Sequence, residues 1–123
     1  MAKQIRVLNV LVVDDNVQAR AMMKLVLNGL GVNQKYTATN GRAAQDFLGS
    51  AEEMVDLIVC DWRMPRMTGL ELLQQVRTAH PDMPFMMVTG KADIDSVEAA
   101  KQYGVNAYVT NPFSPSRSKR DQG

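Results

Sequence analysis

The chain has 123 residues, which is the size of one ordinary domain and is enough to bury a core without disulfides or a structural metal. Hydrophobic residues make up 46% and charged residues 22%, so the composition is that of a folded domain rather than a disordered segment. The net charge of +1 excludes a strong overall attraction to nucleic acid or to an anionic membrane.

Residues 1–6 lack the apolar stretch of a signal peptide, and no run of about 18 apolar residues follows anywhere in the chain. We therefore expect a cytoplasmic protein with no membrane segment. The single cysteine, Cys60, ends an apolar run, where a small buried thiol is the usual occupant. We interpret Cys60 as a core residue.

Short apolar runs alternate along the chain with segments of helical periodicity. The runs are residues 8–13, 36–39, 55–60, 84–88 and 107–110. This alternation predicts crossover connections and a parallel sheet. Residues 57–60 and 85–88 are continuously apolar, which is typical of central strands covered by helices on both faces.

The first two helices are indicated by apolar residues at helical spacing. The first is expected to begin after Asn16, a good N-cap, and to end at Gly31. The second is expected to be short, with Ala43, Phe47 and neighbouring apolar residues on one face and with Gly49 as its end.

The next two helices have recognisable start signals. Residues 68–71 read as a capping box, and the helix that follows cannot continue past Pro81. A similar start at Asp95 opens the fourth helix, with Gly104 available for a left-handed C-terminal position. Alternation then calls for a fifth helix, yet residues 114–123 contain no aliphatic or aromatic side chain to dock. We predict one domain over residues 1–113, with residues 114–123 as a basic tail or linker.

Polar side chains follow the predicted strands. Asp14 and Asp15 follow the first strand, Asp61 the third, Thr89 the fourth and Asn111 the fifth. In open parallel sheets, ligands bind outside the carboxyl ends of the strands. Clustered carboxylates would raise one another's pKa values unless a cation lay among them, and Mg²⁺ prefers such oxygen ligands.

We expect Asp15 and Asp61 to bind Mg²⁺ directly and Asp14 to bind it through water. Asp61 could then act as a nucleophile toward phosphorus and form an aspartyl phosphate, with Thr89 donating its hydroxyl to a phosphoryl oxygen. Each residue taken alone could instead belong to an ordinary turn. Their joint occurrence at successive strand ends favours a site.

The chain also resembles bacterial response-regulator receivers of the chemotaxis-regulator kind. The match covers about residues 8–113 and is carried by the motifs at residues 12–16, 61–73, 88–90, 104–108 and 111–113. The resemblance implies a flavodoxin-like, doubly wound α/β fold with five parallel strands in the order 2-1-3-4-5. That strand order is the one known for regulators of this kind, and the residue pattern alone does not predict it.

The resemblance further implies that Asp61 accepts a phosphoryl group from a histidine kinase or phosphotransfer protein. It implies that Asp15, Asp61 and the backbone carbonyl of Arg63 bind Mg²⁺ with help from Asp14. Thr89 and Tyr108 would couple phosphorylation to a surface recognised by a downstream protein or a fused output domain. No direct contact of this domain with nucleic acid is implied.

Two features depart from the family pattern. Asn111 stands where the family has lysine, and the polar tail stands where the family has a fifth amphipathic helix. We expect the last helix to be short or absent. The sheet face that such a helix covers should then be exposed, or covered by another copy of the chain in a homodimer.

Two alternatives remain open beside a phosphoacceptor switch that is not an enzyme. A degenerate receiver could act as a docking or dimerisation module without phosphorylation. A Mg²⁺-dependent phosphohydrolase with Asp61 as nucleophile is disfavoured, because Arg63 stands two residues later, where no acidic group is available for the second step.

Overall fold

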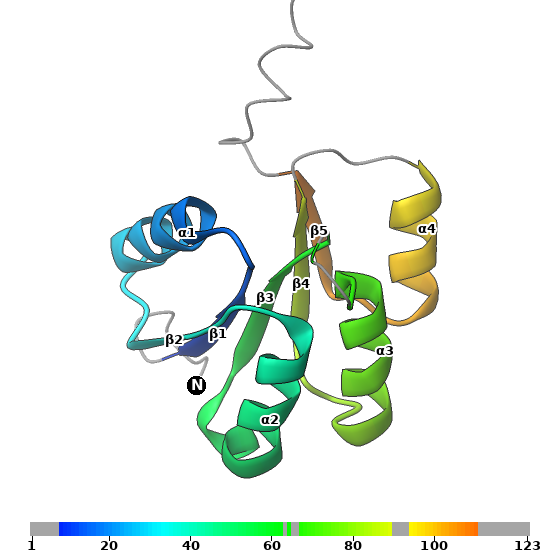
Figure 1. Ribbon diagram of the computed structural model, residues 1–123, viewed down its shortest axis with the longest axis horizontal. Helices are drawn as coiled ribbons and strands as arrows, with labels where there is room; N and C mark the ends of the chain where they lie inside the picture. Colours follow the sequence, from blue (N-terminus) through cyan, green and yellow to red (C-terminus); the bar gives the residue numbers. More distant parts are fainter. Residues whose placement is uncertain (1–7, 63, 65–66, 90–93, 111–123) are drawn as a thin grey trace, which may run out of the picture.

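The computed structural model describes residues 8–62, 64, 67–89 and 94–110 (Figure 1). These residues form a five-stranded parallel sheet in the order β2-β1-β3-β4-β5. The predicted flavodoxin-like fold and strand order are therefore confirmed. The domain boundary predicted at residue 113, the tail and the position of a fifth helix lie outside the described residues.

The strands agree closely with the apolar runs of the sequence. They are β1 (Asn9–Val13), β2 (Gln34–Ala38), β3 (Leu57–Asp61), β4 (Phe85–Thr89) and β5 (Ala107–Thr110). The side chains of β1 and β3 are almost entirely buried, as expected for strands with helices on both faces. The edge strand β2 is mostly exposed or half-buried.

The helices are α1 (Val17–Gly29), α2 (Gly41–Ala51), α3 (Gly69–Ala79) and α4 (Ile94–Gln102). Asn16 caps α1, and its side chain accepts a hydrogen bond of 2.8 Å from the amide of Ala19. The capping box predicted at Thr68 is present at the start of α3. Gly31 and Gly104 both have a φ of 80°, the left-handed conformation that favours glycine.

The prediction that Gly49 ends the second helix was wrong. The α2 helix continues through Gly49 to Ala51, and a short 3-10 helix, η2 (Glu52–Met54), follows. Gly49 does not have a positive φ, so it does not form a left-handed cap. A glycine inside a helix costs only about 1 kcal/mol relative to alanine, which the packing of Leu48 and Ala44 against the core can offset.

The helices form two unequal layers on the sheet. The α2, α3 and α4 helices lie on one face, and α1 lies on the other (Figure 1). The larger buried cluster includes Leu11, Ile58 and Phe85, and the smaller one lies between α1 and the sheet around Val12 and Val59. In the described part of the chain, no helix is long and apolar enough to cross a membrane.

Candidate metal centre

The structure brings together the three carboxylates that follow β1 and β3. The two strands are neighbours, and their register pairs Val13 with Cys60. The residues that come next, Asp14 and Asp61, therefore lie side by side at the carboxyl edge of the sheet, with Asp15 beside them. Carboxylate oxygens of the three residues all lie within 4.8 Å of one another.

Asp14 is the buried member of this cluster, with a relative exposure of 5%. Its Oδ1 atom accepts a hydrogen bond of 2.9 Å from the amide of Asn16, and its own amide donates to the carbonyl of Ala38 at 3.1 Å. Burial raises the pKa of Asp14, and the nearby Asp15 raises it further, whereas the Asn16 hydrogen bond and Arg20 oppose the shift. A bound cation would offset the cost of keeping this carboxylate charged.

The other two carboxylates give the cluster access to solvent. Asp15 is exposed and Asp61 is half-buried. The donor set therefore consists only of carboxylate oxygens, with one side open for water molecules. A small hard cation that keeps several waters, such as Mg²⁺, fits this donor set better than a soft metal that needs sulfur or imidazole ligands.

The turn after β3 is held close to the start of α3. The amide of Gly69 donates a hydrogen bond of 2.8 Å to the carbonyl of Trp62. A Cβ atom at Gly69 would lie 2.5 Å from the backbone oxygen of Asp61 and 3.0 Å from Cα of Trp62. Only glycine fits here, and this close contact fixes the backbone beside Asp61.

Two residues that support the site were not identified from the sequence. Gly69 was interpreted only as part of a helix start, although a glycine is a poor helix former and its use at the first helical position is a signal of close packing. Arg20 carried no sequence signal that links it to the site. Its Nη1 atom donates a hydrogen bond of 2.8 Å to the carbonyl of Asp14, which ties α1 to the acidic cluster.

Cys60 lies next to Asp61 and is fully buried, as predicted. Its thiol donates to the carbonyl of Asp61 at 3.2 Å. Burial raises the pKa of Cys60 well above its ordinary value, and the neighbouring Asp61 and Asp14 raise it further. The thiol therefore stays neutral and serves as a packing group.

The predicted switch residues lie on the next two strands. Thr89 is the last residue of β4, directly after Val88, which pairs with Asp61. Tyr108 lies on β5, and its ring packs against Trp62 with the ring centroids 6.3 Å apart. Tyr108 therefore contacts Trp62, the residue that follows Asp61. Arg63 and Asn111 lie outside the described residues.

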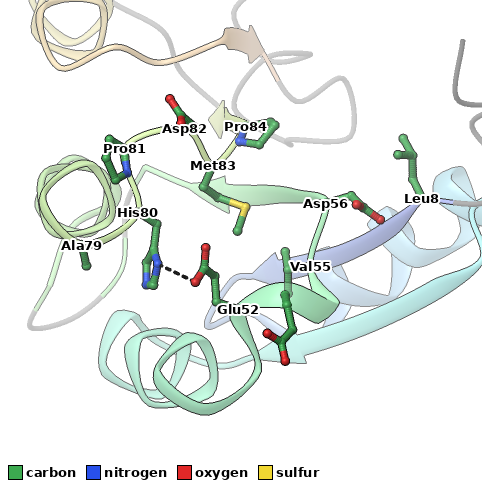
Figure 2. A pocket seen from close by; sticks show the side chains of 11 residues that line it. Leu8, Glu52, Val55, Asp56, Ala79, His80, Pro81, Asp82, Met83 and Pro84 are labelled. Atoms are coloured by element: carbon green, nitrogen blue, oxygen red, sulfur yellow. Dashed lines mark ion pairs between the residues drawn. The ribbon is translucent and has the colours of Figure 1, made fainter.

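A pocket lies at the amino ends of the strands, opposite the acidic cluster. Figure 2 shows this pocket of about 590 Å³, in which His80 Nδ1 and Glu52 Oε1 are 3.2 Å apart. It is lined by residues that precede β1 and β4, such as Leu8 and Pro84. The pocket is therefore separate from the carboxylates at the carboxyl ends of the strands.

Known proteins resemble this chain over most of its length. Residues 10–120 match the sequence model of the response regulator receiver domain. A chemotaxis protein CheY homolog of Campylobacter jejuni is 39% identical over 110 residues, which cover 88% of this chain and 84% of the relative. The chemotaxis protein CheY of Pseudomonas aeruginosa is 38% identical over 109 residues, covering 87% and 86%.

Solved structures agree in fold. The chemotaxis protein CheY4 of Vibrio cholerae superimposes with a TM-score of 0.78 at 29% identity, covering 94% of this chain and 95% of that one. A response regulator receiver protein from Pseudomonas putida superimposes with a TM-score of 0.78 at 24% identity, covering 98% and 96%. Strand order, acidic cluster and sequence match agree, and the chain belongs to the response regulator receiver domain family.

Proposed function

We propose that the chain is a phosphoacceptor receiver module in which Asp61 takes up a phosphoryl group in the presence of Mg²⁺. The observation that carries this proposal is the convergence of Asp14, Asp15 and Asp61, whose carboxylate oxygens lie within 4.8 Å of one another. Three carboxylates so close together repel one another in the absence of a cation. Such a cluster lowers the stability of the folded protein, and a bound cation would offset the repulsion between the carboxylates.

The proposed reaction is a transfer of the phosphoryl group to the Asp61 carboxylate. A carboxylate oxygen attacks the phosphorus of a phosphohistidine, the bond from phosphorus to the imidazole nitrogen breaks, and that nitrogen keeps the electron pair. Asp15 and Asp61 would hold Mg²⁺ together with the carbonyl of Arg63, and Asp14 would assist through water. Bound Mg²⁺ supplies positive charge beside the phosphoryl oxygens.

The contact between Trp62 and Tyr108 offers a route from Asp61 to the surface. The centroids of the two rings lie 6.3 Å apart, and Tyr108 belongs to β5, one of the two edge strands of the sheet. A phosphoryl group on Asp61, with Thr89 as a hydroxyl donor, would bias the position of Tyr108 and of the neighbouring α4 surface. The phosphodonor is a histidine kinase or phosphotransfer protein, and the reader of this surface is a downstream protein or a fused output domain.

This proposal makes the chain a switch rather than an enzyme. A phosphohydrolase needs a placed acid or base to remove the phosphoryl group from Asp61, and Arg63 stands at the position two residues after the nucleophile. Turnover beyond slow loss of the acyl phosphate is therefore not expected.

A degenerate receiver that docks without phosphorylation is a second candidate, and Asn111 is the observation that favours it. An amide offers a neutral donor, whereas a lysine offers a charge-assisted hydrogen bond about twice as strong. We expect the Asn111→Lys variant to strengthen phosphate-dependent NMR shifts near Tyr108 and on α4, by about tenfold in the underlying equilibrium. An unaltered chain that responds as fully as the variant would show that Asn111 is no defect.

Intact mass spectrometry tests the phosphoacceptor function. The protein is incubated with a small-molecule phosphodonor, with Mg²⁺ or with a chelator. We expect the mass of one phosphoryl group to appear only with Mg²⁺ and not in the Asp61→Asn variant. An unmodified wild-type protein that still binds Mg²⁺ would instead favour the degenerate receiver.

A further inference from the structure

An apolar groove runs between α1 and the sheet on the face opposite α2 and α3. Its volume is about 480 Å³, and every residue that lines it has an aliphatic or thioether side chain. One wall is formed by α1 residues such as Met22 and Val26. The floor is formed by β3, β4 and β5, including Val59, Met86 and Val109.

This groove is open in the described part of the chain. Among the described helices, α1 alone lies on this face of the sheet (Figure 1). Val109 on β5 is 41% exposed although it belongs to the groove floor. Adjacent strands lie about 4.8 Å apart, so the floor from β3 to β5 is about 10 Å wide, which is the diameter of one helix.

The residues that follow β5 in the sequence do not show the pattern of such a helix. Residues 111–123 contain one large apolar side chain, Phe113, and the ten residues after it are polar, charged, proline or glycine. A helix that covers a groove of this length needs apolar residues on successive turns. This sequence pattern does not predict a groove-covering helix within residues 111–123.

The apolar surface of the groove continues around α1 to its outer side. Val26 and Leu30 line the groove and are still 42% and 55% exposed, and Leu25, outside the groove, is 63% exposed. With about 100° between successive residues, Leu25 lies about 60° from Met22 around the helix axis. The α1 helix thus presents an apolar ridge beside an apolar groove.

The charges of α1 do not interrupt this ridge. Arg20 is directed toward the sheet edge, where it donates to the carbonyl of Asp14. Lys24 lies two residues from Val26 and so about 160° around the helix from it. No charged residue lines the groove, and the net charge of the chain is +1, so two copies would repel one another only weakly.

We propose that the groove is filled by α1 of a second copy of this chain in a symmetric dimer. A two-fold interface requires one surface that is complementary to itself, and a ridge next to a groove on the same face provides that property. The two α1 helices would lie antiparallel between the two sheets, each over β3 to β5 of the other copy. The acidic cluster and the α4 surface would remain outside the interface.

Sedimentation velocity of the full chain over a wide concentration range tests this proposal. We expect the wild-type protein to dimerise and Leu25→Lys to weaken dimerisation by about tenfold to a hundredfold, because a leucine buried in the interface is replaced by a charge. Val109→Lys should do the same from the groove floor. Met54→Lys is the matched control, because Met54 is 45% exposed on η2, away from the groove. This variant should dimerise like the wild type.

Several outcomes would overturn the proposal. A wild-type monomer at all concentrations rejects it. NMR contacts between groove methyl groups and residues 1–7 or 111–123 would then identify the chain itself as the cover, and their absence would leave a helix of another protein. Equal dimerisation of the Leu25→Lys and Met54→Lys variants would place the interface elsewhere. Growth into open-ended oligomers would exclude a two-fold interface.

Discussion

Asp14 carries a charge that is costly for the folded protein. Burial raises its pKa above the ordinary value, so the folded state binds its proton more tightly than the unfolded state does. A carboxyl group whose pKa is raised on folding stabilises the folded state at low pH. This stabilisation is lost as the pH rises through the raised pKa. At neutral pH without metal, the ionised Asp14 therefore destabilises the fold.

We predict that Asp14→Asn raises the free energy of unfolding at neutral pH in the presence of a chelator. The asparagine oxygen can still accept the hydrogen bond from Asn16, and the charge is removed. Urea unfolding over a pH series should show that the gain shrinks as pH falls below the ordinary Asp pKa, where both proteins are neutral at this position. A variant that is less stable than wild type at neutral pH would contradict the burial argument.

Trp62 provides an optical signal for metal binding because it adjoins Asp61. We predict a saturable change in its fluorescence on addition of Mg²⁺, with weak affinity, since few protein ligands and several waters form the site. Asp15→Asn should weaken binding by at least about tenfold. Asp46→Asn is the matched control, because Asp46 is exposed on α2, where it pairs with Arg42 at 3.9 Å. Equal Mg²⁺ affinities of the two variants would show that Asp15 does not bind the metal.

At the scale of the elements, the junction between β3 and α3 depends on Gly69. We predict that Gly69→Ala lowers the free energy of unfolding by about 1–3 kcal/mol, because its Cβ would overlap the backbone oxygen of Asp61. Gly49→Ala is the matched control. A Cβ at Gly49 would meet nothing within 4 Å, and alanine in a helix should stabilise by about 0.5–1 kcal/mol.

Urea unfolding measures both glycine variants. The close approach at Gly69 also positions Asp61, so Gly69→Ala should reduce the Trp62 response to Mg²⁺, whereas Gly49→Ala should leave it unchanged. Two variants with the same stability change would mean that the backbone beside Asp61 can move without cost.

The different outcomes at three helix boundaries show what local sequence can predict. Asn16 and Thr68 were recognised as N-caps because the hydrogen bonds of a cap are made within a few residues. Gly49 was mistaken for a helix end because glycine permits a left-handed cap without requiring one. Gly69 was overlooked because its neighbour is the carbonyl of Asp61, eight positions away along the chain and close only in the folded protein.

At the scale of the whole molecule, the site follows from topology. The apolar runs predicted five parallel strands, and polar residues at their ends predicted Asp14, Asp15 and Asp61 as neighbours. The run pattern does not state which strands are adjacent, and the order that places β1 beside β3 came from the family resemblance. The apolar groove depends on the packing of α1 against the sheet, which local sequence does not predict.

The central claim is that Asp61 carries the phosphoryl group, and chemical trapping tests it most directly. The protein is treated with a small-molecule phosphodonor and Mg²⁺ and then reduced with borohydride, which converts an aspartyl phosphate into homoserine. Peptide mass spectrometry then locates the changed residue. The account predicts homoserine at position 61, dependent on Mg²⁺ and absent when the phosphodonor is omitted. Homoserine at another aspartate, or none under these conditions, would contradict it.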